Sequence, residues 1–297
     1  MEKEKQSSQL PTVQELFKES WELFKKTIFS YLKLIGLSLA SILLGALIGM
    51  MVGLPALFTN VSLHIQDLST MTPFGITVLI LVILWSILYL AALLILSLVM
   101  PIVSIEILQG NKPARILQLI KHSKHFIVPY FLASFVVGVL ILGGMILLFI
   151  PGLLIAFFFM FVSYEIVVEH QSGRDAMRRS YLLIKNNFWE VFVRVLLIQV
   201  GVSFITWLMN KLATEDFLFV WISVLFSFFA GWFTQVYLFL LYKQVRARTK
   251  VDKTISIRWI VILSSVGWGL FIAGSIALVA GIGHVSGLTA PDLSGRV

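Results

Sequence analysis

The sequence contains seven long apolar stretches, and this feature limits the folds open to the chain more than any other. They cover residues 31–58, 74–105, 126–150, 152–168, 188–209, 217–242 and 259–282. An α-helix needs about 20 apolar residues to cross a bilayer. Hydrophobic residues make up 59% of the chain and charged residues 13%, with a mean hydropathy of +0.95, which no soluble domain could bury. The sequence predicts an all-α fold: a polytopic transmembrane helical bundle of about seven spans.

Two of these stretches have unusual ends or lengths. The third and fourth are separated only by Pro151 and Gly152, a pair that breaks a helix and predicts a tight hairpin. The second is longer than one crossing requires. It tilts, bends at Pro101 or continues beyond the lipid.

The basic residues predict the orientation, because Lys and Arg are retained on the cytoplasmic side. Twenty of the 23 fall in the N-terminal segment and in alternate connections, all on one side of the predicted membrane. Only Lys211 and Arg296 fall on the other side, and Arg194 lies inside a span. We predict a cytoplasmic N-terminus, with no removable signal peptide, and an extracytoplasmic C-terminus. This bias also accounts for the net charge of +8, so we predict no nucleic-acid binding.

An internal repeat is indicated when the chain is compared with itself at an offset of 160 residues. Thr12 with Glu15, and Ser172 with Asp175, have the spacing of a helix capping box. Apolar residues at helical spacing follow each cap and lead into a span. A weaker copy runs from Pro113 to Phe126. The predicted unit is an amphipathic cytoplasmic helix followed by a span out and a span back.

This unit gives the expected domain organisation. A disordered tail (1–11) precedes one membrane domain (12–283), with repeat units at about 12–108, 111–170 and 172–249, an extra span at 259–282, and an extracytoplasmic tail (284–297). The amphipathic helices serve as elbows between spans, or lie along anionic lipid headgroups as a dedicated lipid sensor. The residues predicted to contact headgroups are basic and lie on these helices: Lys25, Lys26, Arg178, Arg179 and Lys185.

Two carboxylates recur where spans return to the cytoplasm. Glu106 in Ser-Ile-Glu-Ile corresponds to Glu165 in Ser-Tyr-Glu-Ile, and Arg194 is the candidate basic partner. Ionisable groups at membrane depth face a partner or a water-filled cavity. These three residues form a candidate intramembrane polar cluster, either a structural ion pair or a group that handles a proton or substrate.

The sequence contains no residue pattern typical of an active site. There is no cysteine, which excludes disulfides, thiolate metal sites and cysteine nucleophiles. Among the histidines only His122 and His125 are close in sequence, without an adjacent carboxylate. No nucleotide-binding loop, nucleophile elbow or zinc-protease motif is present. We expect no cofactor, no metal and no catalytic residue.

One region resembles a known family. The residues are Ser163-Tyr164-Glu165-Ile166-Val167-Val168-Glu169, Ser172-Gly173-Arg174-Asp175-Ala176-Met177-Arg178-Arg179-Ser180-Tyr181 and Lys185-Asn186-Asn187-Phe188-Trp189. Over about residues 140–200 the chain resembles the glycerophosphoryl diester phosphodiesterase membrane domain family and related uncharacterised bacterial integral membrane proteins. The resemblance implies the bacterial cytoplasmic membrane. It implies no phosphodiesterase activity, because that chemistry belongs to a separate soluble barrel domain.

Two functions are compatible with these features, and an intramembrane enzyme ranks third. The first is a non-catalytic accessory, scaffold or lipid-interacting bundle whose partners are membrane lipids and an unknown membrane protein. The alternative is a transporter or permease for a small molecule, ion or lipid, which internal repeats and intramembrane carboxylates favour.

Overall fold

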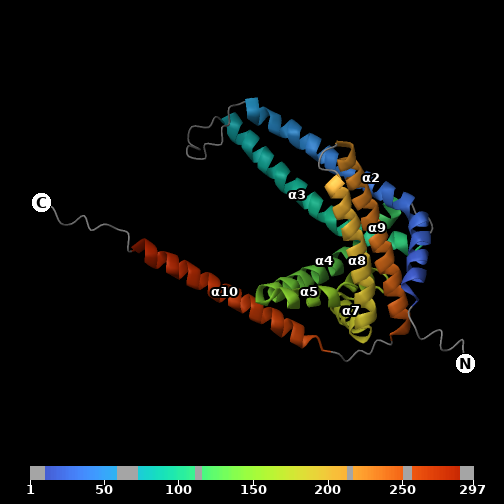
Figure 1. Cartoon of the computed structure of the whole chain (residues 1–297). Helices are drawn as coiled ribbons and strands as arrows, with labels where there is room; N and C mark the ends of the chain where they lie inside the picture. The colour runs from blue at the N-terminus through green and yellow to red at the C-terminus, as the bar shows by residue number, and fades with distance from the viewer. Residues whose placement is uncertain (1–10, 59–72, 111–115, 213–216, 250–255, 288–297) are drawn as a thin grey trace, which may run out of the picture. The chain divides into compact units, whose positions relative to one another are not determined.

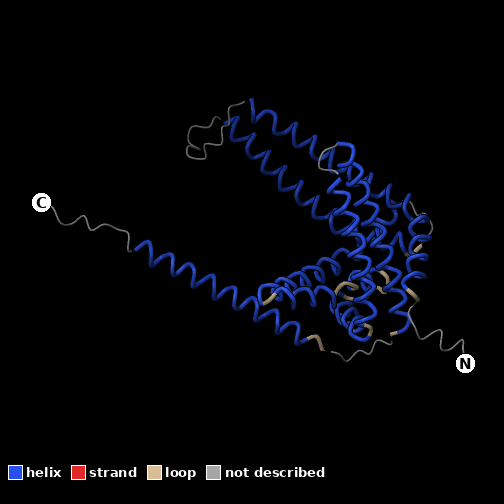
Figure 2. The backbone as a smooth tube through the Cα atoms, viewed as in Figure 1, coloured by secondary structure: helices blue, strands red, loops and turns tan. Residues whose placement is uncertain are grey.

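The fold is built from long apolar helices. The computed structural model describes residues 11–58, 73–110, 116–212, 217–249 and 256–287, and within these ranges it contains helices and no strand (Figures 1 and 2). The helices are α2 (Val13–Phe58), α3 (Pro73–Leu108), α4 (Ile116–Leu147), α5 (Phe149–Phe158), α6 (Val162–Val167), α7 (Gly173–Asn186), α8 (Phe188–Leu212), α9 (Phe217–Arg248) and α10 (Arg258–Gly287).

Seven helical segments of the described chain are long and apolar enough to cross a membrane. The predicted all-α membrane bundle is therefore confirmed, and the chain is a multi-pass membrane protein. The fourth segment, Phe149–Val167, combines α5 and α6. α2 has 46 residues, a length of about 69 Å, so a single crossing accounts for only part of it. The predicted second span is likewise extended, because α3 continues through Pro101 to Leu108.

The chain divides into two compact units. The first unit contains the described residues of 129–193 and 242–297, which include α5, α6, α7 and α10. The second unit contains those of 11–128 and 194–241, which include α2, α3 and most of α8 and α9. The predicted threefold repeat stays a prediction. The expected tails fall almost wholly on residues outside the described ranges, although α10 runs on to Gly287.

The α4–α5 hairpin turns three residues earlier than the sequence predicts. α4 ends at Leu147, Leu148 is extended (φ −162°, ψ 144°), and Pro151 lies in the first turn of α5. Proline is tolerated there because a first-turn N–H has no intrahelical partner. Gly152 forms the close approach: a Cβ atom on it would fall against the backbone of Met145.

The first predicted capping box forms in both directions, and the second forms its N-cap hydrogen bond. The Thr12 backbone N–H donates to Glu15 Oε2 (2.9 Å), and the Glu15 N–H donates to Thr12 Oγ1 (3.3 Å). The Asp175 N–H donates to Ser172 Oγ (3.4 Å). The two helices then differ. α2 continues from its cap without interruption, whereas the chain breaks at Asn187 between α7 and α8.

Candidate functional site: an arginine cavity and buried carboxylates

α7 packs against other helices of the first unit. Its apolar residues Ala176, Leu183 and Ile184 are fully buried, and the helix packs on α5 and α6. Ser180 fixes this packing, because its hydroxyl donates to the Phe158 carbonyl (2.9 Å) and accepts from the Phe161 N–H (3.2 Å). The apolar side of α7 therefore contacts protein, while Arg174 is exposed and Arg178 half-buried.

The basic side of α7 lines a cavity of about 610 Å³ in the first unit. Arg174 and Arg178 come from α7, and Arg258 comes from the start of α10. The remaining lining residues are mostly apolar: Val136, Leu140, Met177, Ile257, Val261 and Ile262, together with Ser256. We call this the arginine cavity. It combines three cations with an apolar wall.

Charge in the arginine cavity is not balanced by the described protein. No carboxylate lines it, and none of its three arginines forms an ion pair with a described residue. The Arg178 Nε atom is buried without a hydrogen-bond partner among the described residues. Guanidinium groups bind phosphate and carboxylate oxygens in paired hydrogen bonds. The cavity therefore suits an anion that carries an apolar chain.

The other residues predicted to contact headgroups have different surroundings. Lys25 is exposed and pairs with Glu22 (2.8 Å), and Lys26 is exposed. Lys185 lies 5.8 Å from the ring centroid of Tyr181. Arg179 turns inward toward Glu165. Of the five predicted residues, the structure places Arg178 in the arginine cavity, and headgroup contact by any of them stays a prediction.

Glu165 lies at the centre of a buried polar network in the first unit, and its side chain is 0% exposed. Tyr242 donates a hydrogen bond to its Oε1 (3.2 Å), Arg246 Nε lies 3.5 Å from the same oxygen, and an Arg179 nitrogen lies 3.9 Å from Oε2. Arg246 also pairs with Glu169 (3.6 Å). These partners come from α7 and α9, so the network joins both helices to α6.

Glu106 and Arg194 lie in the second unit, each with partners of its own. His122 Nδ1 lies 3.0 Å from Glu106 Oε1, and the Ser123 hydroxyl donates to Oε2 (3.4 Å). The sequence did not predict a carboxylate beside His122. Arg194 donates to the Pro11 carbonyl (3.0 Å). A functional cluster of Glu106, Glu165 and Arg194 stays a prediction.

Several of these residues could not be predicted from the sequence. Tyr242 and Arg246 reach Glu165 from far along the chain, and Arg258 joins Arg178 only through the docking of α10. The sequence alone assigns these three residues only to the end of a span or to a basic connection between spans. Within the described ranges, no group of three or more His, Asp or Glu residues could hold a metal ion.

Comparison with protein families gives a match over part of the chain. Residues 125–240, less than half of the chain, are similar to a family described as a domain of unknown function (DUF7847). This stretch includes most of the first unit and the residues that carry the resemblance described above. No curated protein and no solved structure matches the chain. Residues 125–240 are thus similar to an uncharacterised family, and the match assigns no role to them.

Proposed function

We propose that this protein is a non-catalytic, lipid-interacting bundle of the bacterial cytoplasmic membrane, related to the glycerophosphoryl diester phosphodiesterase membrane domain family. Its arginine cavity holds the headgroup of an anionic phospholipid, with the N-terminus in the cytoplasm and the C-terminus outside. The observation that carries this proposal is the set of Arg174, Arg178 and Arg258 against an apolar wall, with no described carboxylate to neutralise them.

The chemistry of the cavity supports an anionic lipid over a soluble anion. A soluble anion needs cations but gains nothing from an apolar wall, whereas Val136, Leu140 and Ile262 offer a surface for an acyl chain. The predicted orientation puts α7 at the cytoplasmic face. Anionic lipids of that leaflet attract each nearby Lys or Arg by about 1 kcal/mol.

Native mass spectrometry of the purified full chain tests the proposal. Phosphatidylglycerol is titrated against phosphatidylcholine for the wild type and for a variant combining Arg174→Gln, Arg178→Gln and Arg258→Gln. We expect phosphatidylglycerol to be preferred, and this preference to fall about tenfold in the variant. Replacing the exposed Lys18, Lys121 and Lys124 with Gln removes the same charge elsewhere and keeps the preference.

Two outcomes contradict the proposal. One is equal binding of both lipids by the wild type. The other is an equal loss of preference in the lysine control, because that result assigns the effect to net charge alone. Uptake of a solute into vesicles, abolished by Glu106→Gln or Glu165→Gln, favours the transporter instead.

A further inference from the structure

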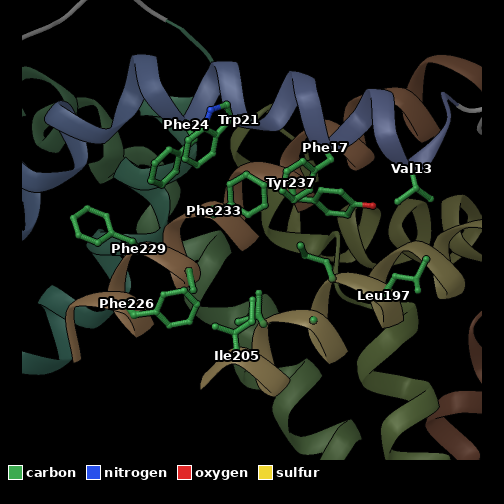
Figure 3. A pocket seen from close by; sticks show the side chains of 14 residues that line it. Val13, Phe17, Trp21, Phe24, Leu197, Ile205, Phe226, Phe229, Phe233 and Tyr237 are labelled. Carbon is green, nitrogen blue, oxygen red and sulfur yellow. The ribbon is translucent and has the colours of Figure 1, made fainter. Parts of the chain in front are cut away.

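The second unit contains an apolar cavity of about 560 Å³ that is separate from the arginine cavity. Three helices line it: α2 with Val13, Phe17, Trp21 and Phe24, α8 with residues between Leu197 and Ile205, and α9 with residues between Phe226 and Tyr237 (Figure 3). Cavities of about 300–1,000 Å³ with apolar walls and few polar groups are typical ligand sites. We call this the α2–α8–α9 cavity.

Aromatic side chains give the cavity fixed walls. Phe233 of α9 packs against Phe17 (ring centroids 5.0 Å apart), Trp21 (6.2 Å) and Phe24 (5.9 Å) of α2. Across from them, a Cβ atom on Gly201 would meet nothing within 4 Å. The space beside Gly201 is therefore open, while the α2–α9 side is closed by packed rings.

One polar group among the lining residues has no partner. The Tyr237 side chain is 1% exposed, and its hydroxyl has no hydrogen-bond partner among the described residues. Figure 3 shows this hydroxyl at the Val13 end of the cavity. A buried hydroxyl without a partner costs free energy. A ligand oxygen at this point removes that cost.

Positive charge lies at the same end. Arg194 donates to the carbonyl of Pro11, two residues before Val13. The rest of the lining, including the Phe226 end, is apolar. Arg194 does not line the cavity, so the lining itself is polar at the Tyr237 hydroxyl and apolar at the Phe226 end. This arrangement matches an amphiphile with its oxygen atoms beside Tyr237.

The length of the cavity matches one bilayer leaflet. Tyr237 and Phe226 are 11 residues apart on α9, about 16 Å along the helix. Half of a hydrocarbon core is about 15 Å. Lining residues such as Phe17 (48% exposed) and Leu197 (48%) keep the cavity open to the surroundings of the unit.

We propose that the α2–α8–α9 cavity binds one acyl chain of a membrane phospholipid, whose ester or phosphate oxygen accepts a hydrogen bond from Tyr237. This site goes beyond the arginine cavity, because it uses other helices and selects for the chain of the lipid. Lipid binding can be absent at either cavity while it is present at the other.

Photo-crosslinking of the full chain in phosphatidylcholine vesicles tests this site. The probe is a phosphatidylcholine with a diazirine group in one acyl chain, which the arginine cavity does not favour. We expect crosslinks to concentrate on residues 226–237 of α9 and 197–205 of α8. Gly201→Leu fills the open space and lowers labelling severalfold. Gly231→Leu is the matched control, because Gly231 also has open space around it but does not line the cavity.

A second variant tests the site in case Gly201→Leu misfolds. Tyr237→Phe keeps the ring and removes the hydroxyl, and we expect about fivefold weaker labelling, the loss of one neutral hydrogen bond. Three results overturn the proposal. They are unchanged labelling in Gly201→Leu, labels spread evenly over all the apolar helices, and labelling by a diazirine fatty acid but not by the phospholipid.

Discussion

At the scale of single residues, Glu165 is the group whose position depends most on its neighbours. Its side chain is fully enclosed, and it is neutralised by Arg179 and Arg246 and hydrogen-bonded by Tyr242. A buried charge is tolerated only when paired, and removing one partner leaves a charge in a medium that does not solvate it. We therefore interpret this network as a structural joint between α6, α7 and α9.

Arg246→Gln tests this interpretation. We expect a loss of about 3 kcal/mol in the free energy of unfolding, because Glu165 loses its nearer cation. Adding Glu165→Gln to the same chain should recover part of the loss. Arg248→Gln is the control: Arg248 pairs with Glu190, which is 53% exposed, so its removal costs less than about 1 kcal/mol. Unfolding in detergent micelles measures all three, and equal losses for Arg246→Gln and Arg248→Gln contradict the structural role.

Sequence analysis could predict that Glu165 needs a partner but could not supply its identity. Membrane depth follows from the apolar residues before it, and an unpaired carboxylate at that depth is costly. Tyr242 lies 77 positions further along the chain, and only the packing of α9 brings it close. The same reason explains why the contact of His122 with Glu106 was not predicted: the two residues lie on different helices.

At the scale of helices, a close glycine contact determines how α10 packs against α4. A Cβ atom on Gly267 would fall against the backbone carbonyl of Gly143 in α4. Trp268 Nε1 donates to the Val139 carbonyl (3.1 Å), as does the Ser264 hydroxyl (3.4 Å). α10 also carries Arg258, so this packing helps to complete the arginine cavity.

Gly267→Val should separate α10 from α4. The added side chain overlaps backbone that cannot rotate away, and overpacking of this kind costs about 1–3 kcal/mol. We expect a lower unfolding temperature in detergent and a weaker preference for phosphatidylglycerol. Gly269→Val, on the same helix with open space around it, should leave both properties unchanged. If Gly267→Val keeps its full stability and its full preference for phosphatidylglycerol, the result contradicts this packing.

Glycines within the apolar helices do not all make close contacts. Gly45 and Gly49 do pack closely, because a Cβ atom on either would overlap the ring of Tyr89 or Trp85 in α3. Gly138, which lies on α4 as Gly143 does, has nothing within 4 Å of such an atom. Spacing along one helix cannot tell which side faces a neighbour, so only part of the packing could be predicted.

At the scale of the whole molecule, the bias of basic residues predicts a cytoplasmic N-terminus and an extracytoplasmic C-terminus. The chain contains no cysteine, so single cysteines can be introduced without background. In intact cells, a membrane-impermeant maleimide should label Thr289→Cys, and it should label Ser7→Cys only after lysis. Labelling of both positions from the same side means an even number of spans and contradicts the predicted topology.

The proposed arginine cavity should select anionic phospholipids in a bilayer. Electron paramagnetic resonance of spin-labelled lipids measures this directly, as the fraction of each lipid immobilised by the reconstituted protein. We expect a larger immobilised fraction for phosphatidylglycerol than for phosphatidylcholine. The difference should disappear when Arg174, Arg178 and Arg258 are replaced by Gln and persist when Lys18, Lys121 and Lys124 are replaced. Equal fractions for both lipids with the wild-type protein contradict it.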